Sequence, residues 1–229
     1  MLYECRQFDA ATITLGDRFL IGMGNRRRVF VHPDHPNLCI KIARTSHIRS
    51  QLDKRSYLHS LMPTHWRDDN WLEARAYQQP LLAVLTPEVQ RHIPTLYGWQ
   101  NTNLGKGLVF DFYTDKTGLP AKNLSDLILE NGVTAEIRRA VNELKEFILN
   151  QSPWMRRPGP PNIVYGADNH LKLVDCLGTY NMRWQKHIPA IRRRRRRRHN
   201  NYLEIEIAAL QKQHAHASGK LAIFEEVAL

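Results

Sequence analysis

A glycine pair followed by a lysine in an apolar strand is the feature that most constrains how this chain folds. Gly22 and Gly24 follow one apolar run, and Lys41 stands between two isoleucines in a later one. A His-Pro-Asp-His-Pro-Asn segment predicts a turn between strands at 28–31 and 38–43. Because side chains alternate along a strand, the lysine points away from the face that holds its apolar neighbours. The strands at 28–31 and 38–43 are predicted to form a hairpin. The glycines before it predict a loop whose backbone a ligand can approach closely; for the glycines alone, an ordinary tight turn is the alternative.

Composition favours a globular protein of the cytoplasm. The chain has 229 residues and 42% hydrophobic content, which is enough for a core in one domain or two small lobes. No apolar run of about 18 residues predicts a transmembrane helix, and residues 1–9 lack the apolar region of a secretory signal. Cys5, Cys39 and Cys176 have no metal-ligand spacing and cannot all pair. A reducing compartment fits this cysteine usage.

Seven consecutive arginines, from Arg192 to Arg198, carry most of the excess positive charge. Without them the formal net charge falls from +11 to +4, so the rest of the chain is a mildly basic globule. Residues 191–210 are predicted to form one basic helix. The run is either a solvated helix face or a contact for a polyanion, such as acidic lipid head groups or nucleic-acid phosphates. No aromatic residues are interleaved for base stacking, so sequence-specific nucleic-acid recognition is not expected.

The two halves of the chain differ in their expected secondary structure. A polar segment with glycine and proline at 114–120 is the best candidate boundary between a strand-rich and a helix-rich half. In the second half, Thr134 is predicted to cap a helix that runs to about Gln151. A short strand pair, 162–165 and 171–174, is expected to follow.

Helices are expected between the two strand pairs of the first half. Residues 46–62 predict a polar helix. Asn70 and Glu73 resemble a capping box at the head of a further helix, which Pro80 is expected to end or kink. Glu73 has a second possible role, as the carboxylate that holds Lys41, and the two roles compete.

Asn162 and Asp175 form a second constellation, at the start and just past the end of the later strand pair. Behind the glycines and Lys41, their order resembles that of a protein kinase. In that pattern the lysine contacts phosphates, while the amide and carboxylate oxygens bind Mg²⁺. Taken singly, Asn162 is more simply a turn residue and Asp175 a strand-end cap.

The same resemblance implies an adenine site on a strand at 108–112. The backbone of Asp111 and Tyr113 would meet the adenine edge, and Phe110 would lie at the back of the pocket. Together with Gly22, Gly24, Lys41 and Glu73, these residues form the expected nucleotide site.

The chain resembles the YrbL family, small bacterial proteins of the PhoP regulatory network with a kinase-like fold. The resemblance covers roughly residues 20–210 and implies a nucleotide site without settling an activity. Five motifs carry it: Ile21-Gly-Met-Gly24 with Arg27 in place of the third glycine, His32-Pro33 with Leu38-Cys-Ile-Lys41, Ile93-Pro-Thr-Leu-Tyr-Gly98, Pro160 with Asn162-Ile163, and Asp175-Cys-Leu-Gly178.

Departures from the kinase pattern concern the chemistry. Arg157 stands where a kinase carries its catalytic aspartate, and an arginine cannot act as a base. Gly159 replaces the loop lysine, the segment beginning at Asp175 is one residue longer than Asp-Phe-Gly, and no Ala-Pro-Glu follows. Binding of ATP is therefore better supported than transfer of its phosphate.

We expect an α+β, bilobal, protein kinase-like fold, with a strand-rich lobe of about five strands at 1–113 and a helical lobe at 114–229. The expected cofactors are ATP and Mg²⁺. Two classes of function stay open: an atypical phosphotransferase or other nucleotide-using enzyme, and a non-catalytic nucleotide-sensing regulator or pseudokinase. A polyanion-binding adaptor, suggested by the arginine run, is a third.

Overall fold

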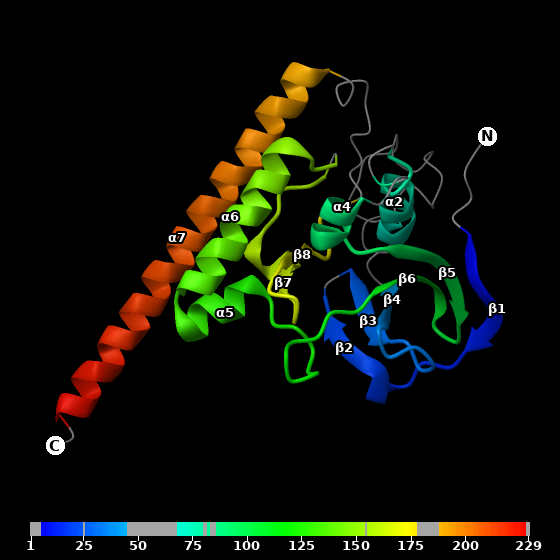
Figure 1. The fold of residues 1–229 in the computed structure, drawn as a ribbon. Coiled ribbons are helices and arrows are strands. Elements are labelled where there is room, and N and C mark those ends of the chain that lie inside the picture. Colours follow the sequence, from blue (N-terminus) through cyan, green and yellow to red (C-terminus); the bar gives the residue numbers. More distant parts are fainter. Residues whose placement is uncertain are drawn as a thin grey trace, which may run out of the picture.

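The computed structural model describes residues 6–24, 26–44, 68–79, 82, 86–153, 155–177 and 188–227. The fold is α+β (Figure 1): a six-stranded sheet built by the first half is followed by a mainly helical part. This confirms the predicted fold class. The predicted helix at 46–62, together with Cys5, Pro80 and Gly178, lies outside the described residues.

The sheet has the strand order β1-β5-β6-β4-β3-β2. Its strands are β1 (Gln7–Ile13), β2 (Leu20–Met23), β3 (Arg27–Val31), β4 (Leu38–Ala43), β5 (Leu96–Thr102) and β6 (Gly105–Asp111). β1 runs parallel to β5, and all other neighbours are antiparallel. The hairpin predicted at 28–31 and 38–43 and the strand predicted at 108–112 are confirmed as β3, β4 and β6. The prediction of about five strands is wrong, because the sheet has six. β1 is an edge strand with mostly exposed side chains, so it lacks the apolar alternation that marks a strand in a sequence.

The strand β4 separates two apolar clusters on opposite faces of the sheet. Ile40 and Ile42 pack with Phe30 on one face. Cys39 packs with Phe110 on the other face, against helix α2 (Asp69–Ala76). Lys41 shares the α2 face, as the alternation along the strand predicts. A lysine is thus held, only 6% exposed, between a sheet and a helix.

The start of α2 differs from the prediction. Asp68, not Asn70, is the N-cap residue, and its carboxylate accepts the Asn70 N–H at 2.8 Å. Asn70 is fully buried and donates its side-chain amide to the Lys41 carbonyl at 2.8 Å. The predicted capping box is wrong because Asp68, a capping residue as good as Asn70, takes the N-cap position two residues earlier. Glu73 is therefore free for a role toward the sheet.

The helical part forms the largest core cluster, with Leu144, Ile148 and Ile163 at its centre. Thr134 caps α6 by accepting the Ile137 N–H, and the helix ends at its C-cap Gln151, as predicted. Two short helices interrupt the sheet strands: η1 (Asp17–Phe19) between β1 and β2, and α4 (Pro87–His92) before β5. The later elements are α5 (Leu124–Asn131), α6 (Ala135–Asn150), η4 (Pro160–Asn162), β7 (Ile163–Tyr165), β8 (Leu171–Leu173) and α7 (Pro189–Val227). β7 and β8 pair antiparallel, which confirms the predicted strand pair.

Helix α7 is longer than predicted and runs beside α6 and α5 (Figure 1). It continues to Val227, past the expected end near residue 210. The apolar signal fades there because this stretch is mostly exposed up to Gly219. No helix within the described ranges combines the length and the apolar character needed to cross a bilayer.

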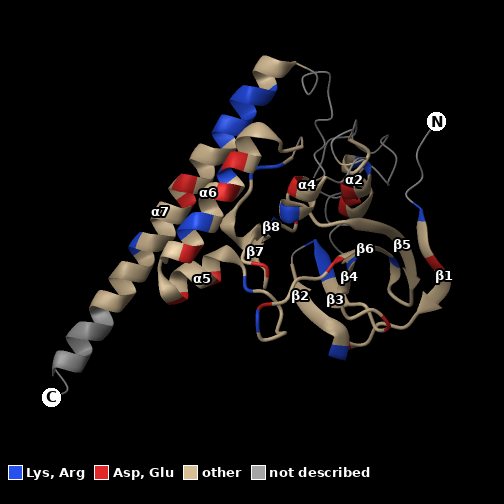
Figure 2. Ribbon diagram, in the orientation of Figure 1, with Lys and Arg blue, Asp and Glu red and all other residues tan. Residues whose placement is uncertain are grey.

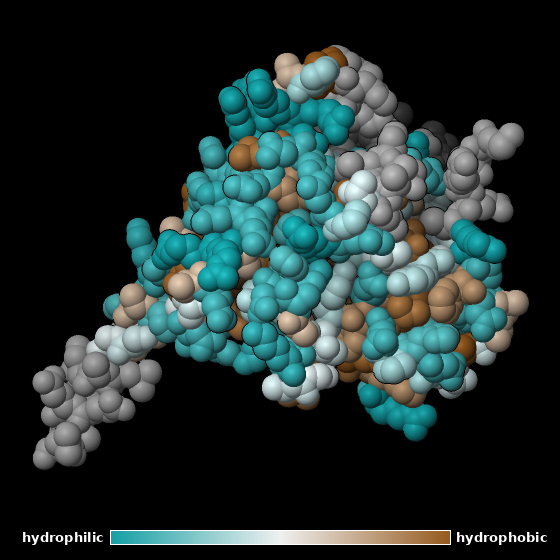
Figure 3. Space-filling model, viewed as in Figure 1, coloured by the Kyte–Doolittle hydropathy of each residue, from teal (hydrophilic) through white to brown (hydrophobic). Residues whose placement is uncertain are grey.

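The arginine run lies in the first turns of α7, where Figure 2 shows basic residues and Figure 3 a hydrophilic surface. Two of its arginines point back to the protein. Arg196 donates to the carbonyls of Leu149, Asn150 and Ser152 at 3.2, 2.7 and 2.7 Å. Arg195 donates to the Met155 carbonyl at 2.9 Å. Four others are exposed: Arg193, Arg194, Arg197 and Arg198.

Candidate functional site

A cleft of about 720 Å³ opens between the sheet and the helical part. Both halves of the chain line it, so the fold brings together motifs that are far apart in sequence. Of the residues predicted for a nucleotide site, eight line the cleft: Gly22, Gly24, Lys41, Phe110, Asp111, Tyr113, Asn162 and Asp175. Glu73 lies behind Lys41 and is 2% exposed.

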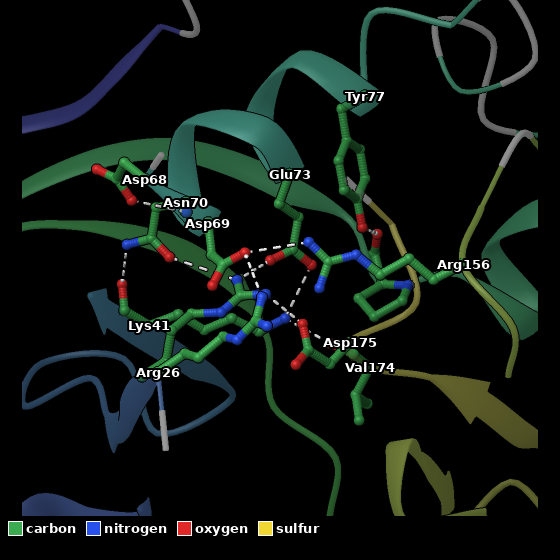
Figure 4. Close-up of polar contacts among 12 residues, drawn as sticks. Arg26, Lys41, Asp68, Asp69, Asn70, Glu73, Tyr77, Arg156, Val174 and Asp175 are labelled. Atoms are coloured by element: carbon green, nitrogen blue, oxygen red, sulfur yellow. Dashed lines mark hydrogen bonds and ion pairs between the residues drawn. The ribbon is translucent and has the colours of Figure 1, made fainter. Parts of the chain in front are cut away.

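Lys41 connects the sheet, the helix and the later strand pair. Its Nζ lies 2.9 Å from Glu73 Oε1 and also donates to the Val174 carbonyl, next to Asp175 (Figure 4). The same Nζ lies 4.3 Å from the centre of the Phe110 ring. Of the two roles considered for Glu73, the structure has the carboxylate paired with Lys41. This is the lysine–glutamate pair of the kinase pattern.

Arg27 is a site residue whose role sequence reasoning missed. Its guanidinium pairs with Glu73 through Nη1 and with Asp175 through Nη2, and Nη1 also lies 3.4 Å from Asn70 Oδ1. The side chain is 7% exposed. The position was noted as the replacement for the third glycine of the loop, but nothing in the sequence indicates which acids this arginine meets.

A second set of charges borders the first. Asp69 Oδ1 accepts from Arg156 Nη2 at 3.0 Å and lies 3.5 Å from Arg26 Nη1 (Figure 4). Both arginines line the cleft, and they are 30% and 44% exposed. None of these three residues was predicted, because each comes from a different loop or helix end and has no motif around it.

The protonation of this cluster follows from burial and neighbouring charges. Burial opposes the charge of Glu73, but Arg27 and Lys41 outweigh it and hold the pKa of this carboxyl below its ordinary value. Burial also acts against the charge of Arg27, yet Glu73, Asp175 and Asp69 together raise the pKa of its guanidinium. Desolvation raises the pKa of Asp175, and Arg27 and Lys41 offset this only in part. The cluster is a charged network in which Glu73 and Arg27 are buried and the Asp175 side chain is 41% exposed.

The loop glycines are not required by the packing of the protein. A Cβ at Gly22 would meet Val29 at 3.8 Å, and one at Gly24 would meet the Arg27 carbonyl at 3.6 Å, both ordinary contacts. Neither glycine has a positive φ. By contrast, a Cβ at Gly107 would overlap the side chains of Ile40 and Ile42. Because the protein itself would accept a Cβ at Gly22 and Gly24, the two glycines fit a loop that a ligand approaches closely better than a turn that needs glycine for its own geometry.

The strand edge expected to meet adenine is held in place by side chains. The Asp111 carboxylate accepts the Thr95 N–H at 2.7 Å and the Tyr97 hydroxyl at 2.9 Å. The Asp111 carbonyl accepts the weak Cys39 thiol donor at 3.5 Å, and the Tyr113 carbonyl accepts the Ala121 N–H at 3.0 Å. The Asp111 carbonyl is therefore the better acceptor for a ligand at this edge.

Arg157 lies away from the cleft. It is exposed, and its guanidinium stacks 4.8 Å from the centre of the Tyr202 ring on α7. The neighbouring Arg156 lines the cleft, and its backbone N–H donates to the Cys176 carbonyl at 2.8 Å. The carboxylates that line the cleft are Asp111, which is engaged at the strand edge, and Asp175, which is paired with Arg27.

The predicted magnesium ligands are both present, but their surroundings fit a metal poorly. Asn162 and Asp175 line the same cleft, with the Val174 N–H donating to the Asn162 carbonyl at 3.0 Å. The Asp175 carboxylate, however, already has the Arg27 guanidinium as its cationic partner. Within the described ranges, no three His, Cys, Asp or Glu side chains gather as metal ligands. The thiols of Cys39 and Cys176 are buried, which raises the pKa of each to about 12.

Comparison with known proteins gives similar solved structures and one family. The protein kinase PpkA-294 in its apo form matches with 19% identity and a TM-score of 0.47, over 68% of this chain and 56% of that one. The present chain thus corresponds to little more than half of that structure. No curated protein matches.

The family match covers most of the chain. The model described as PhoP regulatory network protein YrbL matches residues 13–205, a span that includes the cleft and the arginine run. The predicted family is therefore confirmed. This chain belongs to the YrbL family of PhoP regulatory network proteins.

Proposed function

We propose that the cleft binds a nucleoside triphosphate, with ATP as the reference ligand. The observation that carries the proposal is the Lys41–Glu73 pair at 2.9 Å, set beside the open Gly22–Gly24 loop in one cleft. A strand lysine held by a helix glutamate is the arrangement that positions phosphates in kinases. The Phe110 side of the cleft would take the base, with the Asp111 carbonyl and the Tyr113 backbone at its edge.

We further propose that binding is not coupled to kinase-type phosphate transfer. The Arg157 side chain packs against Tyr202 of α7 instead of lining the cleft, and the carboxylates that line the cleft are already engaged. A base that takes a hydroxyl proton must lie within hydrogen-bond reach of the substrate. A nucleotide-sensing regulator fits this arrangement better than a phosphotransferase.

Nucleotide binding is tested best with glycine variants, because they leave the charged network intact. Gly22→Ala and Gly24→Ala should fold as the wild type and bind ATP at least about tenfold more weakly, a loss of about 1.4 kcal/mol. Gly16→Ala is the matched control, since a Cβ there is also accommodated without a clash but Gly16 lies outside the cleft. Calorimetric titration with ATP measures the affinity. Failure of the wild type to bind, or equal affinity in all three variants, would contradict the site.

Measurement of ATP turnover distinguishes a non-catalytic nucleotide-sensing regulator from an enzyme. Purified wild-type protein with radiolabelled ATP should neither hydrolyse the nucleotide nor label a generic protein substrate. Transfer that is lost in Asp175→Ala would show that another group supplies the base and that this cleft is catalytic.

We propose a second function for the exposed part of the arginine run, a sequence-independent contact with a polyanion. Arg193, Arg194, Arg197 and Arg198 are exposed at spacings that place them side by side on one helix stripe. This favours a contact over seven equivalent solvated charges, because the arginines that bond to the protein are a different subset.

The test replaces these four exposed arginines with glutamine. Binding to duplex DNA or anionic vesicles should weaken, and for DNA the slope of log affinity against log salt should flatten by about 3–4. A control with the same change in charge replaces four scattered exposed residues, Arg18, Lys106, Lys116 and Lys212. An equal effect in the control would show that binding depends on net charge and not on the four arginines. Absence of wild-type binding would contradict the proposed contact.

A further inference from the structure

The charge that faces Asp175 distinguishes this cleft from the kinase pattern. In that pattern the corresponding aspartate binds Mg²⁺, which bridges the phosphates and neutralises their charge. Here the Asp175 carboxylate pairs with Arg27 Nη2, while Arg27 Nη1 pairs with Glu73. A guanidinium thus stands where the pattern calls for a metal ion, and it belongs to the chain itself.

The balance of charges in the cleft has a different sign from that of the kinase set. Lysine, glutamate and aspartate alone sum to one negative charge, so a triphosphate needs added cations. Asp111 also lines the cleft, but its carboxylate is engaged at the strand edge by the Thr95 N–H and the Tyr97 hydroxyl. Around Lys41 and Asp175, four basic side chains, Arg26, Arg27, Lys41 and Arg156, meet three carboxylates, those of Asp69, Glu73 and Asp175. The sum is one positive charge, which attracts a polyanion without a metal.

The basic groups differ in how firmly they are held. Arg27 is 7% exposed and has three acceptors, which fixes it against Asp175. Arg26 and Arg156, whose side chains are 44% and 30% exposed, both contact the carboxylate of Asp69 and line the cleft. Guanidinium groups bind phosphate oxygens through paired N–H donors, so these two are suited to reach a ligand.

We propose that the cleft binds its nucleoside triphosphate free of Mg²⁺, with Arg27 neutralising Asp175 in place of the divalent cation. The inference rests on the proposed nucleotide binding and adds the ionic form of the ligand. Free ATP is more negative than its magnesium complex. The net positive charge around Lys41 and Asp175 should therefore favour binding of free ATP. It also revises the prediction that Asn162 and Asp175 hold Mg²⁺.

The decisive experiment uses the wild-type chain. ATP affinity is measured by calorimetry in excess EDTA and in excess Mg²⁺ at matched ionic strength, with melting temperatures of the protein alone in both buffers as the control. We expect the affinity in EDTA to equal or exceed that in Mg²⁺, within about threefold. Binding that requires Mg²⁺, with a loss of more than about tenfold in EDTA, would overturn the inference and leave nucleotide binding intact. Absence of binding in both buffers would instead overturn the proposed function and the inference with it.

Asp175→Asn provides a second, independent measurement. The amide keeps the size of the side chain and removes its negative charge, so Arg27 gains freedom to meet a phosphate. ATP affinity in EDTA should stay the same or rise by a few fold. A site that depended on a metal at Asp175 would lose affinity more than about tenfold in Mg²⁺, and that result would contradict the assignment.

Discussion

The guanidinium of Arg27 in the cleft and the guanidinium groups of two half-buried α7 arginines have different partners. Arg27 meets the carboxylates of Glu73 and Asp175, which raise the pKa of its guanidinium despite burial. Arg195 and Arg196 donate to backbone carbonyls, and burial lowers the pKa of both. A carbonyl offers a partial charge and a carboxylate a full one. Arg27 is therefore part of the charged network of the cleft, whereas two arginines of the run at Arg192 to Arg198 bind carbonyls of the body of the protein.

The largest effect is expected for Arg27→Met. The substitution leaves Asp175 without its cation and Glu73 with Lys41 alone, and removing one partner of a buried ion pair costs about 3 kcal/mol. Urea denaturation at pH 7 measures the loss in the free energy of unfolding. Arg26→Met is the control and should lose less than about 1 kcal/mol, because the side chain is 44% exposed. Equal losses in both variants would remove the distinction between a fixed and a mobile arginine.

The next effect depends on pH and concerns His199, directly after the run. Burial, then Arg195 and Arg157, lower the pKa of this imidazole to about 4 in the folded protein. The unfolded chain takes up a proton near pH 6.5 and the folded chain does not, so stability falls as the pH drops from about 6.5 towards 4. By pH 5 the contribution of His199 to this loss should be about 2 kcal/mol.

Urea denaturation of wild type and His199→Gln at pH 7 and pH 5 isolates that contribution. The variant should lose less stability between the two pH values than the wild type. Parallel losses would show that other groups, such as His92, whose pKa burial also lowers, account for the pH dependence.

A smaller effect is expected for Arg196→Met. Three carbonyls at the end of α6 lose a charged donor, and the helix loses a cation at its negative end, for a cost of about 1.5 kcal/mol. Arg197→Met removes an exposed neighbour and should change stability by less than about 0.5 kcal/mol. Urea denaturation of the two variants compares them. If they lose the same stability, the run does not divide into structural and solvent-facing arginines.

Much of the fold could be predicted because its signals are local. Thr134 starts α6, the isoleucines around Lys41 define β4, and the turn before β8 is rich in polar residues. β1 was not predicted because an exposed edge strand has no apolar alternation in its sequence. The α2 cap was misplaced because Asp68 and Asn70 are both good capping residues two positions apart, and only their geometry decides between them.

The candidate site was predictable only where a motif carried it. Gly22, Gly24, Lys41 and Asp175 belong to spaced patterns, and the structure brings them to one cleft. Arg27, Asp69 and Arg156 meet across elements far apart in sequence, so no local pattern could reveal their pairing. Their roles depend on which acid each base meets, and a sequence does not contain that information locally.

The pairing of β1 with β5 sets an order for folding. Thr12 pairs with Asn101, whereas β5 and β6 close through the short turn between Thr102 and Gly105. Closing a long loop costs more entropy than closing a hairpin, so β1 should dock after the remainder of the sheet exists. As an edge strand with one neighbour, it should also be among the first to open in the native state, with amide protons that exchange before those of β4.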